Sequence, residues 1–369
     1  MKKVGLYYPE LDSLRFFAFL MVLVHHSPYM KSITAWKTLS RYGWMGVDLF
    51  LCLSAFLFVR LLFVEYQEKG NINIGYFYLR QALRIWPLYF IFFAAMLTLS
   101  IYIDGWNTYM LKRSIGMLTF TDNIFTAVFS YNVVIWFSDH LWTISYEEQF
   151  YLIIPWVLRK LYQIKKSTAT MILGGAMLIG MLIRWIFIYN QIDHPDIWVL
   201  PITHFESIFG GLMIGLGLFD KFLKKIPSWL LLIGGVLALY AVTLLPNVDK
   251  IQWKLMLTYP LIGIGTSLVL FAIMQGNVWL ISKLLKIKFL GYLGKISYGL
   301  YVYHLACLWL AFKITNAFVS PERLLVYPAT AILLGLVITI VVSMTSYQFL
   351  EKPFLRLKEK FTFIRSRPV

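Results

Sequence analysis

The stretch DSLRFFAFLMVLVHHS, residues 12–27, is the first long apolar segment of the chain, and it contains Arg15 near its start and His25 and His26 near its end. An ionisable side chain in the hydrocarbon region of a membrane is costly unless the protein satisfies it, so such residues are usually functional. A helix turns about 100° and rises about 1.5 Å per residue. The helix therefore returns to within about 20° of its starting direction between Arg15 and His26, roughly 16 Å further on. The sequence predicts one polar stripe with Arg15 and His26 at its ends, and His25 points about 100° away from it.

The composition around this segment is that of a polytopic membrane protein. Of the 369 residues, 59% are hydrophobic and 14% are charged. In soluble domains, roughly 45–50% of the residues are hydrophobic and about 25% are charged. Apolar runs of about eighteen residues or more recur along the chain, each long enough to cross roughly 30 Å of hydrocarbon as a helix. We therefore predict an all-α fold, a polytopic membrane helix bundle.

The apolar runs predict about ten transmembrane helices. Their ranges are 11–30, 44–64, 85–103, 141–158, 168–189, 203–219, 228–246, 255–274, 296–316 and 326–350. Together they predict one membrane domain over residues 1–352, which a basic tail over residues 353–369 follows. Most of the 34 lysines and arginines then fall on one side, as they do in cytoplasmic loops. We predict that both termini are cytoplasmic, that the protein is a multi-pass protein of the cytoplasmic membrane, and that it has no nucleic-acid partner.

The segment MLTFTDNIFTAVFSYNVVIWF, residues 117–137, is apolar enough to be considered an eleventh crossing. Counting it would move every later basic loop to the outer side, against the expected distribution of lysine and arginine. Asp122, Asn123 and Asn132 also fit poorly in lipid. We interpret the segment as an interfacial or re-entrant element on the outer side, where irregular backbone is tolerated if protein buries it.

The polar stripe of the first helix has a structural and a functional interpretation. In the first, Arg15 extends to the inner interface and His26 bonds to a neighbouring helix. In the second, the stripe lines a channel with a general base at its far end, because an imidazole with a pKa of roughly 6.5 accepts a proton near neutral pH. The six histidines lack metal-ligand spacing, so no metal site is predicted, and no glycine-rich cofactor motif occurs in the sequence.

Five sequence elements occur in order along the chain. They are Arg15 and His26 with ten residues between them, GVDLF (46–50) with SAFL (54–57), WTISYEEQFY (142–151), SYGLYVYH (297–304) and FLEKPF (349–354). In this order they resemble the motifs of the acyltransferase 3 family of integral-membrane acyltransferases, which most often acetylate cell-surface carbohydrates. The likeness spans nearly the whole chain. Ala55 stands where the family usually has glycine, and Gln81 stands where many members have another arginine.

This resemblance implies that residues 1–352 form a membrane acyltransferase domain, and that the protein is an acyl-CoA-dependent O-acyltransferase with acetyl-CoA as the donor substrate and no bound cofactor. The implied acceptor is a hydroxyl of a surface polysaccharide or a lipid-linked glycan, and membrane lipid surrounds the chain. Some family members carry an extra extracytoplasmic domain that completes the transfer. Because this chain ends soon after its last predicted helix, we expect transfer within the membrane domain or hand-over to a separate extracytoplasmic transferase.

His26 is the predicted catalytic base, with Arg15 and Glu147 beside it. His26 removes the proton from the acceptor hydroxyl, and Arg15 anchors the donor or stabilises charge. Asp48 and Glu147 are predicted near the outer ends of the second and fourth helices, at the level of His26, where either can orient the imidazole or hold the acceptor hydroxyl. The alternative for both is a structural carboxylate that faces water.

The predicted substrate-binding residues lie on three helices. Arg80 and Arg84, four residues apart and so on one face of a helix, can grip the phosphates of CoA, or else serve as orientation charges. Tyr301 and His304 share a face of the ninth helix and are predicted to line the same cavity as Arg15. Asp48 completes this set.

Two other classes of function use the same residues. In a proton-coupled transporter or flippase, Arg15 and His26 would form a proton relay. A catalytically inactive relative would act as a membrane scaffold. Dependence on acyl-CoA separates these interpretations, because only the enzyme consumes a thioester.

Overall fold

Helices make up most of the part of the chain that the computed structural model describes, which is residues 4–27, 34–131, 134–320, 322–323 and 326–365. The first elements are β1 (Val4–Gly5), α1 (Pro9–His25), α2 (Thr34–Tyr42), α3 (Met45–Lys69), α4 (Ile74–Asp104), α5 (Thr108–Leu118), α6 (Asp122–Phe129), α7 (Trp142–Leu161) and α8 (Lys166–Tyr189). The later elements are α9 (Asp196–Val199), α10 (Glu206–Gly215), α11 (Asp220–Leu223), α12 (Ser228–Thr243), α13 (Leu255–Met274), α14 (Trp279–Leu285), α15 (Lys288–Lys295), α16 (Ser297–Phe318), α17 (Val326–Ser346), the π-helical turn η1 (Tyr347–Glu351), α18 (Lys352–Glu359) and β2 (Ile364–Arg365).

Five helical segments among the described residues are long and apolar enough to cross a membrane. They are α3, α4, α8, α13 and the continuous segment from α17 through η1 to α18. Two shorter apolar helices, α10 and α12, accompany them. Several helices of this length and hydropathy indicate a multi-pass membrane protein. That the chain crosses the membrane ten times, and in which orientation, stays a prediction.

Each of the ten predicted segments contains a helix, and the predicted range 255–274 coincides with α13. The largest difference in a helix start is at α4, which begins at Ile74 rather than at residue 85. The side chain of Asn73 accepts a hydrogen bond of 2.9 Å from the backbone nitrogen of Tyr76 and so caps the helix. Hydropathy missed this start because a cap, not an apolar residue, sets it. Residues 28–30 of the first predicted crossing lie outside the described part.

The helix in the predicted crossing over residues 203–219 is shorter than expected. The helix there, α10, has 10 residues, and a helix of this length rises only about 15 Å, about half of the hydrocarbon thickness. It ends just before Gly217, whose φ of 65° lies in the left-handed region. Thr203 and His204, in the turn before α10, are almost fully buried, as irregular backbone at membrane depth must be.

The segment 117–137 holds no helix of crossing length among its described residues. It contains the end of α5, a turn and α6, which has 8 residues. Eight residues rise only about 12 Å. No helix in the described part of the segment is long enough for an eleventh crossing, which favours the interfacial or re-entrant interpretation. Asn132 lies outside the described part.

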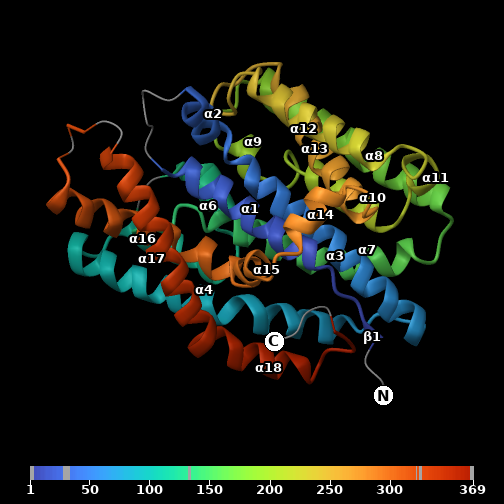
Figure 1. Ribbon diagram of the computed structural model, residues 1–369, viewed down its shortest axis with the longest axis horizontal. Coiled ribbons are helices and arrows are strands. Elements are labelled where there is room, and N and C mark those ends of the chain that lie inside the picture. Colours follow the sequence, from blue (N-terminus) through green and yellow to red (C-terminus); the bar gives the residue numbers. More distant parts are fainter. Residues whose placement is uncertain (1–3, 28–33, 132–133, 321, 324–325, 366–369) are drawn as a thin grey trace.

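The helices α1 and α3 run through the middle of the bundle (Figure 1). On one side of them lie α4, α16, α17 and α18, and on the other lie α8, α10, α12 and α13. Gly46 allows α1 and α3 to approach closely, because a Cβ at this position would lie 2.4 Å from the carbonyl oxygen of Ala18. The GVDLF motif thus brings the start of α3 against the polar helix α1.

The first and the last strand of the chain lie together at one end of the bundle. The short strands β1 and β2 pair in parallel, with Val4 opposite Ile364, which is a small exception to the all-α prediction. A hydrogen bond of 3.1 Å from Arg80 to the backbone oxygen of Phe361 also fixes the C-terminal segment. The pairing agrees with the prediction that both termini lie on the same side.

Candidate functional site

Three cavities follow one another along α1. We call them the inner, middle and outer cavities, and they have volumes of about 110, 60 and 360 Å³. The inner cavity lies at the end of the bundle that carries the paired strands, since Tyr7, Tyr8 and Lys358 line it. The order from inner to outer follows α1 from Arg15 to His26.

Shared wall residues connect these cavities. Arg15, Arg84, Ser297 and Tyr298 line both the inner and the middle cavity. Val47, Thr143 and Tyr301 line both the middle and the outer cavity. The three cavities are therefore neighbours in a row along α1, with Arg15 at the inner end and His26 at the outer end, where His25 also lines the wall.

His26 follows the last residue of α1 and lines the outer cavity, where its side chain is exposed. Its Nδ1 atom lies 3.1 Å from the carbonyl oxygen of Val22 and 3.0 Å from Nε2 of His304. The Nδ1 atom of His304 lies 2.5 Å from the carbonyl oxygen of Tyr301. A carbonyl oxygen only accepts, so in the neutral rings both Nδ1 atoms carry the proton. His26 then donates to His304, and its own Nε2 keeps a free lone pair.

His140, which the sequence reasoning missed, lies beside this pair. Its ring centroid is 4.7 Å from that of His304 and 5.1 Å from that of Tyr301. It lines the outer cavity, and neither of its ring nitrogens has a hydrogen-bond partner among the described residues. Burial and the neighbouring His26 lower the pKa of His140 to about 3. The one signal for it in the sequence is its position two residues before the WTISYEEQFY segment.

The loop that carries His140 is fixed by a buried ion-pair cluster. Arg113 of α5 contacts Asp122 at 3.2 Å and Asp139 at 3.1 Å, and it donates a hydrogen bond of 3.0 Å to the backbone oxygen of Ser138. Arg113 and Asp122 are almost fully buried. The α5–α6 element therefore holds the loop before α7 against the histidines.

Glu147 lies in the middle cavity, which Arg15 and Arg84 also line. It accepts a hydrogen bond of 2.7 Å from the hydroxyl of Tyr151. The prediction that Glu147 orients the imidazole of His26 is not supported by this position, because the ring nitrogen of His26 contacts His304 instead. Thr143, about one helical turn before Glu147 in α7, lines the outer cavity. Glu147 therefore lies one turn further from the outer cavity.

The structure separates the two predicted donor-site arginines. Arg84 lines the inner and middle cavities and a side cavity of about 70 Å³. Arg80 lines only the side cavity, and it forms an ion pair of 3.1 Å with Glu65. Of the two, Arg84 is the one that the fold brings to Arg15.

Asp48 lies away from all three cavities. It is almost fully buried, and its Oδ1 atom lies 2.8 Å from Nε2 of His204 and accepts a hydrogen bond of 2.6 Å from Ser207. The hydroxyl of Tyr146 donates to the backbone oxygen of His204, and Arg184 pairs with Glu206 nearby. Asp48 orients an imidazole, but that of His204 rather than that of His26, and this network ties α3 to α10.

The two predicted residues of the ninth helix differ in position. Tyr301 lies between the middle and outer cavities, where its hydroxyl contacts that of Thr143 at 2.6 Å and donates to the backbone oxygen of His140 at 3.0 Å. His304 is fully buried and lines none of the three cavities. It reaches a substrate only through His26.

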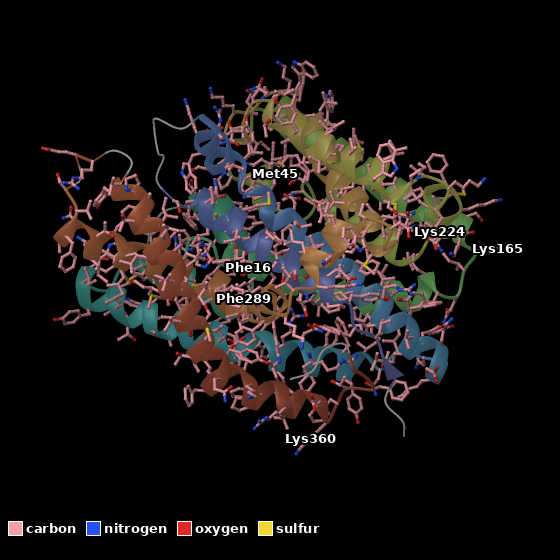
Figure 2. All side chains as sticks on the ribbon, viewed as in Figure 1. Phe16, Met45, Lys165, Lys224, Phe289 and Lys360 are labelled. Carbon is pink, nitrogen blue, oxygen red and sulfur yellow. The ribbon has the colours of Figure 1, made fainter. Side chains whose placement is uncertain are left out.

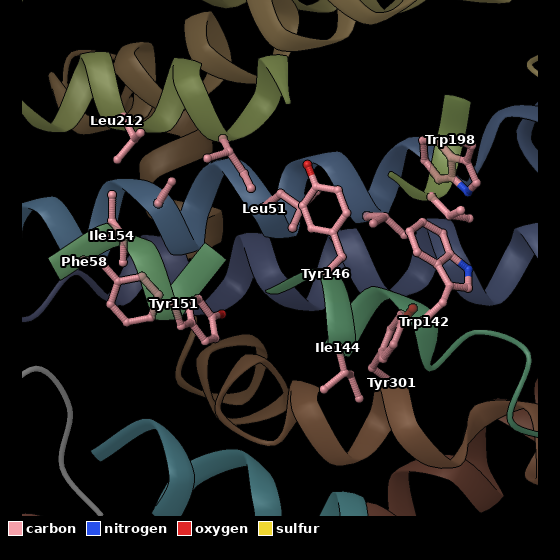
Figure 3. Packing of buried hydrophobic residues seen from close by; sticks show 14 of the residues in the cluster. Leu51, Phe58, Trp142, Ile144, Tyr146, Tyr151, Ile154, Trp198, Leu212 and Tyr301 are labelled. Carbon is pink, nitrogen blue, oxygen red and sulfur yellow. The ribbon is translucent and has the colours of Figure 1, made fainter. Parts of the chain in front are cut away.

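Aromatic rings and polar groups share the wall of the outer cavity. Trp44, Trp142 and Trp198 line it, together with Asp139 and Asp249. Figure 3 shows Trp142 of α7, Trp198 of α9 and Tyr301 of α16 at one end of the packed core. No group of three or more histidine, cysteine or carboxylate side chains in the described part is arranged to hold a metal ion.

The chain belongs to the acyltransferase 3 family, because the family model described as "Acyltransferase domain" matches residues 8–348. It is 27% identical over 377 residues to "Putative O-acetyltransferase SACOL0978" of Staphylococcus aureus strain COL, a match that covers 98% of this chain and 59% of that protein. It is 25% identical over 362 residues to the O-acetyltransferase OatA of Staphylococcus aureus strain NCTC 8325, covering 94% of this chain and 57% of OatA. The chain thus spans less than two thirds of the length of these relatives. No solved structure matches it.

Proposed function

We propose that this protein is an acyl-CoA-dependent O-acyltransferase of the cytoplasmic membrane that moves an acyl group, acetyl from acetyl-CoA, to a hydroxyl of a cell-surface or lipid-linked glycan. The observation that carries the proposal is the row of cavities that joins Arg15 and Arg84 to His26. The membership of the family and the likeness to O-acetyltransferases support the reaction type.

The donor enters this row from the inner cavity. Arg15 and Arg84 attract its phosphates, and the narrow middle cavity suits the extended arm that carries the thioester. The acceptor occupies the outer cavity, where the tryptophans offer apolar faces and Asp139 and Asp249 accept hydrogen bonds from hydroxyl groups. The two substrates meet beside His26.

The transfer step uses the free Nε2 atom of His26. This atom takes the proton of the acceptor hydroxyl while the hydroxyl oxygen attacks the thioester carbonyl carbon. The carbon–sulfur bond then breaks, and the imidazolium returns the proton to the leaving thiolate. While the imidazole ring of His26 is protonated, the hydrogen bonds from its Nδ1 atom to His304 and to Val22 disperse the positive charge. A separate extracytoplasmic transferase is the alternative acceptor of the acyl group, since longer relatives contain additional sequence.

The test is the transfer of labelled acetyl from acetyl-CoA in membranes that contain the native surface glycans. Wild type, His26→Ala and His25→Ala are compared at matched expression. His25 lines the same outer cavity, but its Nδ1 atom lies 2.8 Å from the backbone oxygen of Ser40 and not from His304, so His25→Ala controls for the loss of a histidine from this wall. We expect His26→Ala to lose about 10²- to 10⁴-fold in rate, while His25→Ala keeps transfer. Near-normal turnover by a folded His26→Ala protein would disprove the base assignment, and no acetyl-CoA consumption by the wild type would disprove the donor.

A further inference from the structure

The C-terminal helix α18 forms part of the wall of the inner cavity. Lys358 of this helix lines the inner cavity with Arg15 and Arg84, and it lines the side cavity with Arg80 and Arg84. The sequence placed this residue in a basic tail behind the membrane domain. The fold instead packs α18 against α4 and η1, and Leu355 and Lys358 of this helix line the cavity.

Several contacts hold the segment after α18 in place. Arg80 donates a hydrogen bond of 3.1 Å to the backbone oxygen of Phe361, and the ring of Phe361 lies 5.7 Å from that of Tyr76. The Lys69 ammonium lies 4.1 Å from the ring centroid of Phe363. Together with the pairing of β2 with β1, these contacts fix the position of Lys358 independently of any ligand.

The inner cavity carries a surplus of positive charge. Four cations line it, Arg15, Arg84, Lys295 and Lys358, against two carboxylates, Asp12 and Glu351. Asp12 lies 3.7 Å from Arg15. Among the described residues no ion pair uses Arg84 or Lys358. Cations that outnumber the carboxylates of a cavity repel one another, and an anion bound in the cavity reduces that repulsion.

We propose that Lys358 is a ligand of an anion site, formed with Arg15 and Arg84, which binds the phosphate groups of the thioester donor. The inference rests on the proposed function for the source of the phosphates, but the site itself follows from charge and position. Lysine binds a phosphate as a point charge beside the planar guanidinium groups of the two arginines. The C-terminal segment is thus part of the donor site.

The variant Lys358→Gln tests the site in the full chain, in nanodiscs of phosphatidylcholine. The control is Lys360→Gln, because Lys360 is exposed and lies at the outer edge of the molecule (Figure 2). Binding of CoA and of inorganic pyrophosphate is measured for each form. We expect Lys358→Gln to weaken both by about ten- to a hundredfold, Lys358→Arg to keep most of the affinity, and Lys360→Gln to match the wild type.

Thermal unfolding without ligand separates this role from a structural one. Removing one of several like charges relieves repulsion, so Lys358→Gln should unfold at the same or a higher temperature than the wild type. If Lys358 merely held α18 in place, its replacement would lower the unfolding temperature. Unchanged binding in Lys358→Gln, or a loss of binding that accompanies a lower unfolding temperature, overturns the proposal.

The probes also separate this inference from the proposed function. Lys358-dependent binding of pyrophosphate without binding of CoA keeps the anion site and contradicts the acyl-CoA donor. Absence of binding of both probes in the wild type overturns the anion site. If only phosphatidylglycerol in the nanodisc stabilises the protein in a Lys358-dependent way, the phosphate belongs to a lipid headgroup and the assignment to the donor is wrong.

Discussion

The Nε2 atom of His304 lies 3.0 Å from the Nδ1 atom of His26, although 278 residues separate the two in the chain. The contact occupies Nδ1 and leaves the lone pair of Nε2 on His26, a residue that lines the outer cavity. His304 itself is fully buried. It is a positioning residue, which fixes the tautomer and the orientation of His26 and accepts a hydrogen bond from its Nδ1 atom.

Replacement of His304 should therefore affect the chemical step rather than binding. We expect His304→Ala to lower kcat by about tenfold or more, but less than removal of the base itself. KM for acetyl-CoA should stay the same. His304→Gln should retain more activity than His304→Ala, because the amide oxygen can accept from Nδ1 of His26. Steady-state kinetics with acetyl-CoA measures both constants, and a raised KM with unchanged kcat would contradict the positioning role.

Tyr301 separates the middle cavity from the outer cavity through its contacts with Thr143 and the backbone of His140. Removal of the ring in Tyr301→Ala should join the two cavities and admit water to the thioester. We expect acetyl-CoA hydrolysis to rise when no acceptor is present. The control is Tyr303→Ala, because the hydroxyl of Tyr303 bonds to Ser346 and its ring lines none of the three cavities. Equal hydrolysis by wild type and Tyr301→Ala would show that the ring is no barrier.

Arg113 should be a stability residue of the outer side. Arg113→Ala leaves the buried carboxylate of Asp122 without its cation, which costs about 3–5 kcal/mol. The matched control is Lys112→Ala, because Lys112 is exposed on the same helix. Thermal or denaturant unfolding in detergent measures the difference. Similar unfolding midpoints for both variants would contradict the buried ion-pair cluster as a clamp on the loop of His140.

Asp48 should also act on stability and not on substrate binding. Asp48→Ala leaves His204 and Ser207 without their shared acceptor in a fully buried site, and we expect a loss of about 3 kcal/mol or more. Glu68→Ala, an exposed carboxylate on the same helix, is the control. Protein that remains folded should bind acetyl-CoA as the wild type does. A changed affinity at full stability would restore the substrate-binding prediction for Asp48.

His140 should make the folded protein sensitive to acid. Its pKa is lowered to about 3 in the folded state, whereas an unfolded histidine titrates near 6.5. Between these values the unfolded chain binds more protons, so stability falls by about 1.4 kcal/mol for each unit by which the pH drops below roughly 6.5. His140→Gln should remove this contribution. Unfolding measured from neutral pH down to about pH 4.5 should give a flatter profile for the variant, and identical profiles would contradict the burial of a neutral ring.

The amino-acid sequence was sufficient to predict the class of fold and the helical regions. These features depend on hydropathy and on the period of a single helix, both of which are local. The order of five motifs along the chain also indicated the family, and the match to the family model confirmed it. The predicted helix bounds differ most from the structure at two places where hydropathy does not set the helix end. The cap at Asn73 sets the start of α4, and α10 is shorter than its apolar segment.

The packing of the helices, in contrast, determines which side chains meet. Asp48 contacts His204, Glu147 lies with Arg15 and Arg84 in the middle cavity, and His140 completes the histidine cluster. Lys358 reaches the inner cavity from the C-terminal tail. Such contacts join helices that lie far apart in the chain, and helix periodicity specifies which face a residue occupies but not which partner that face meets.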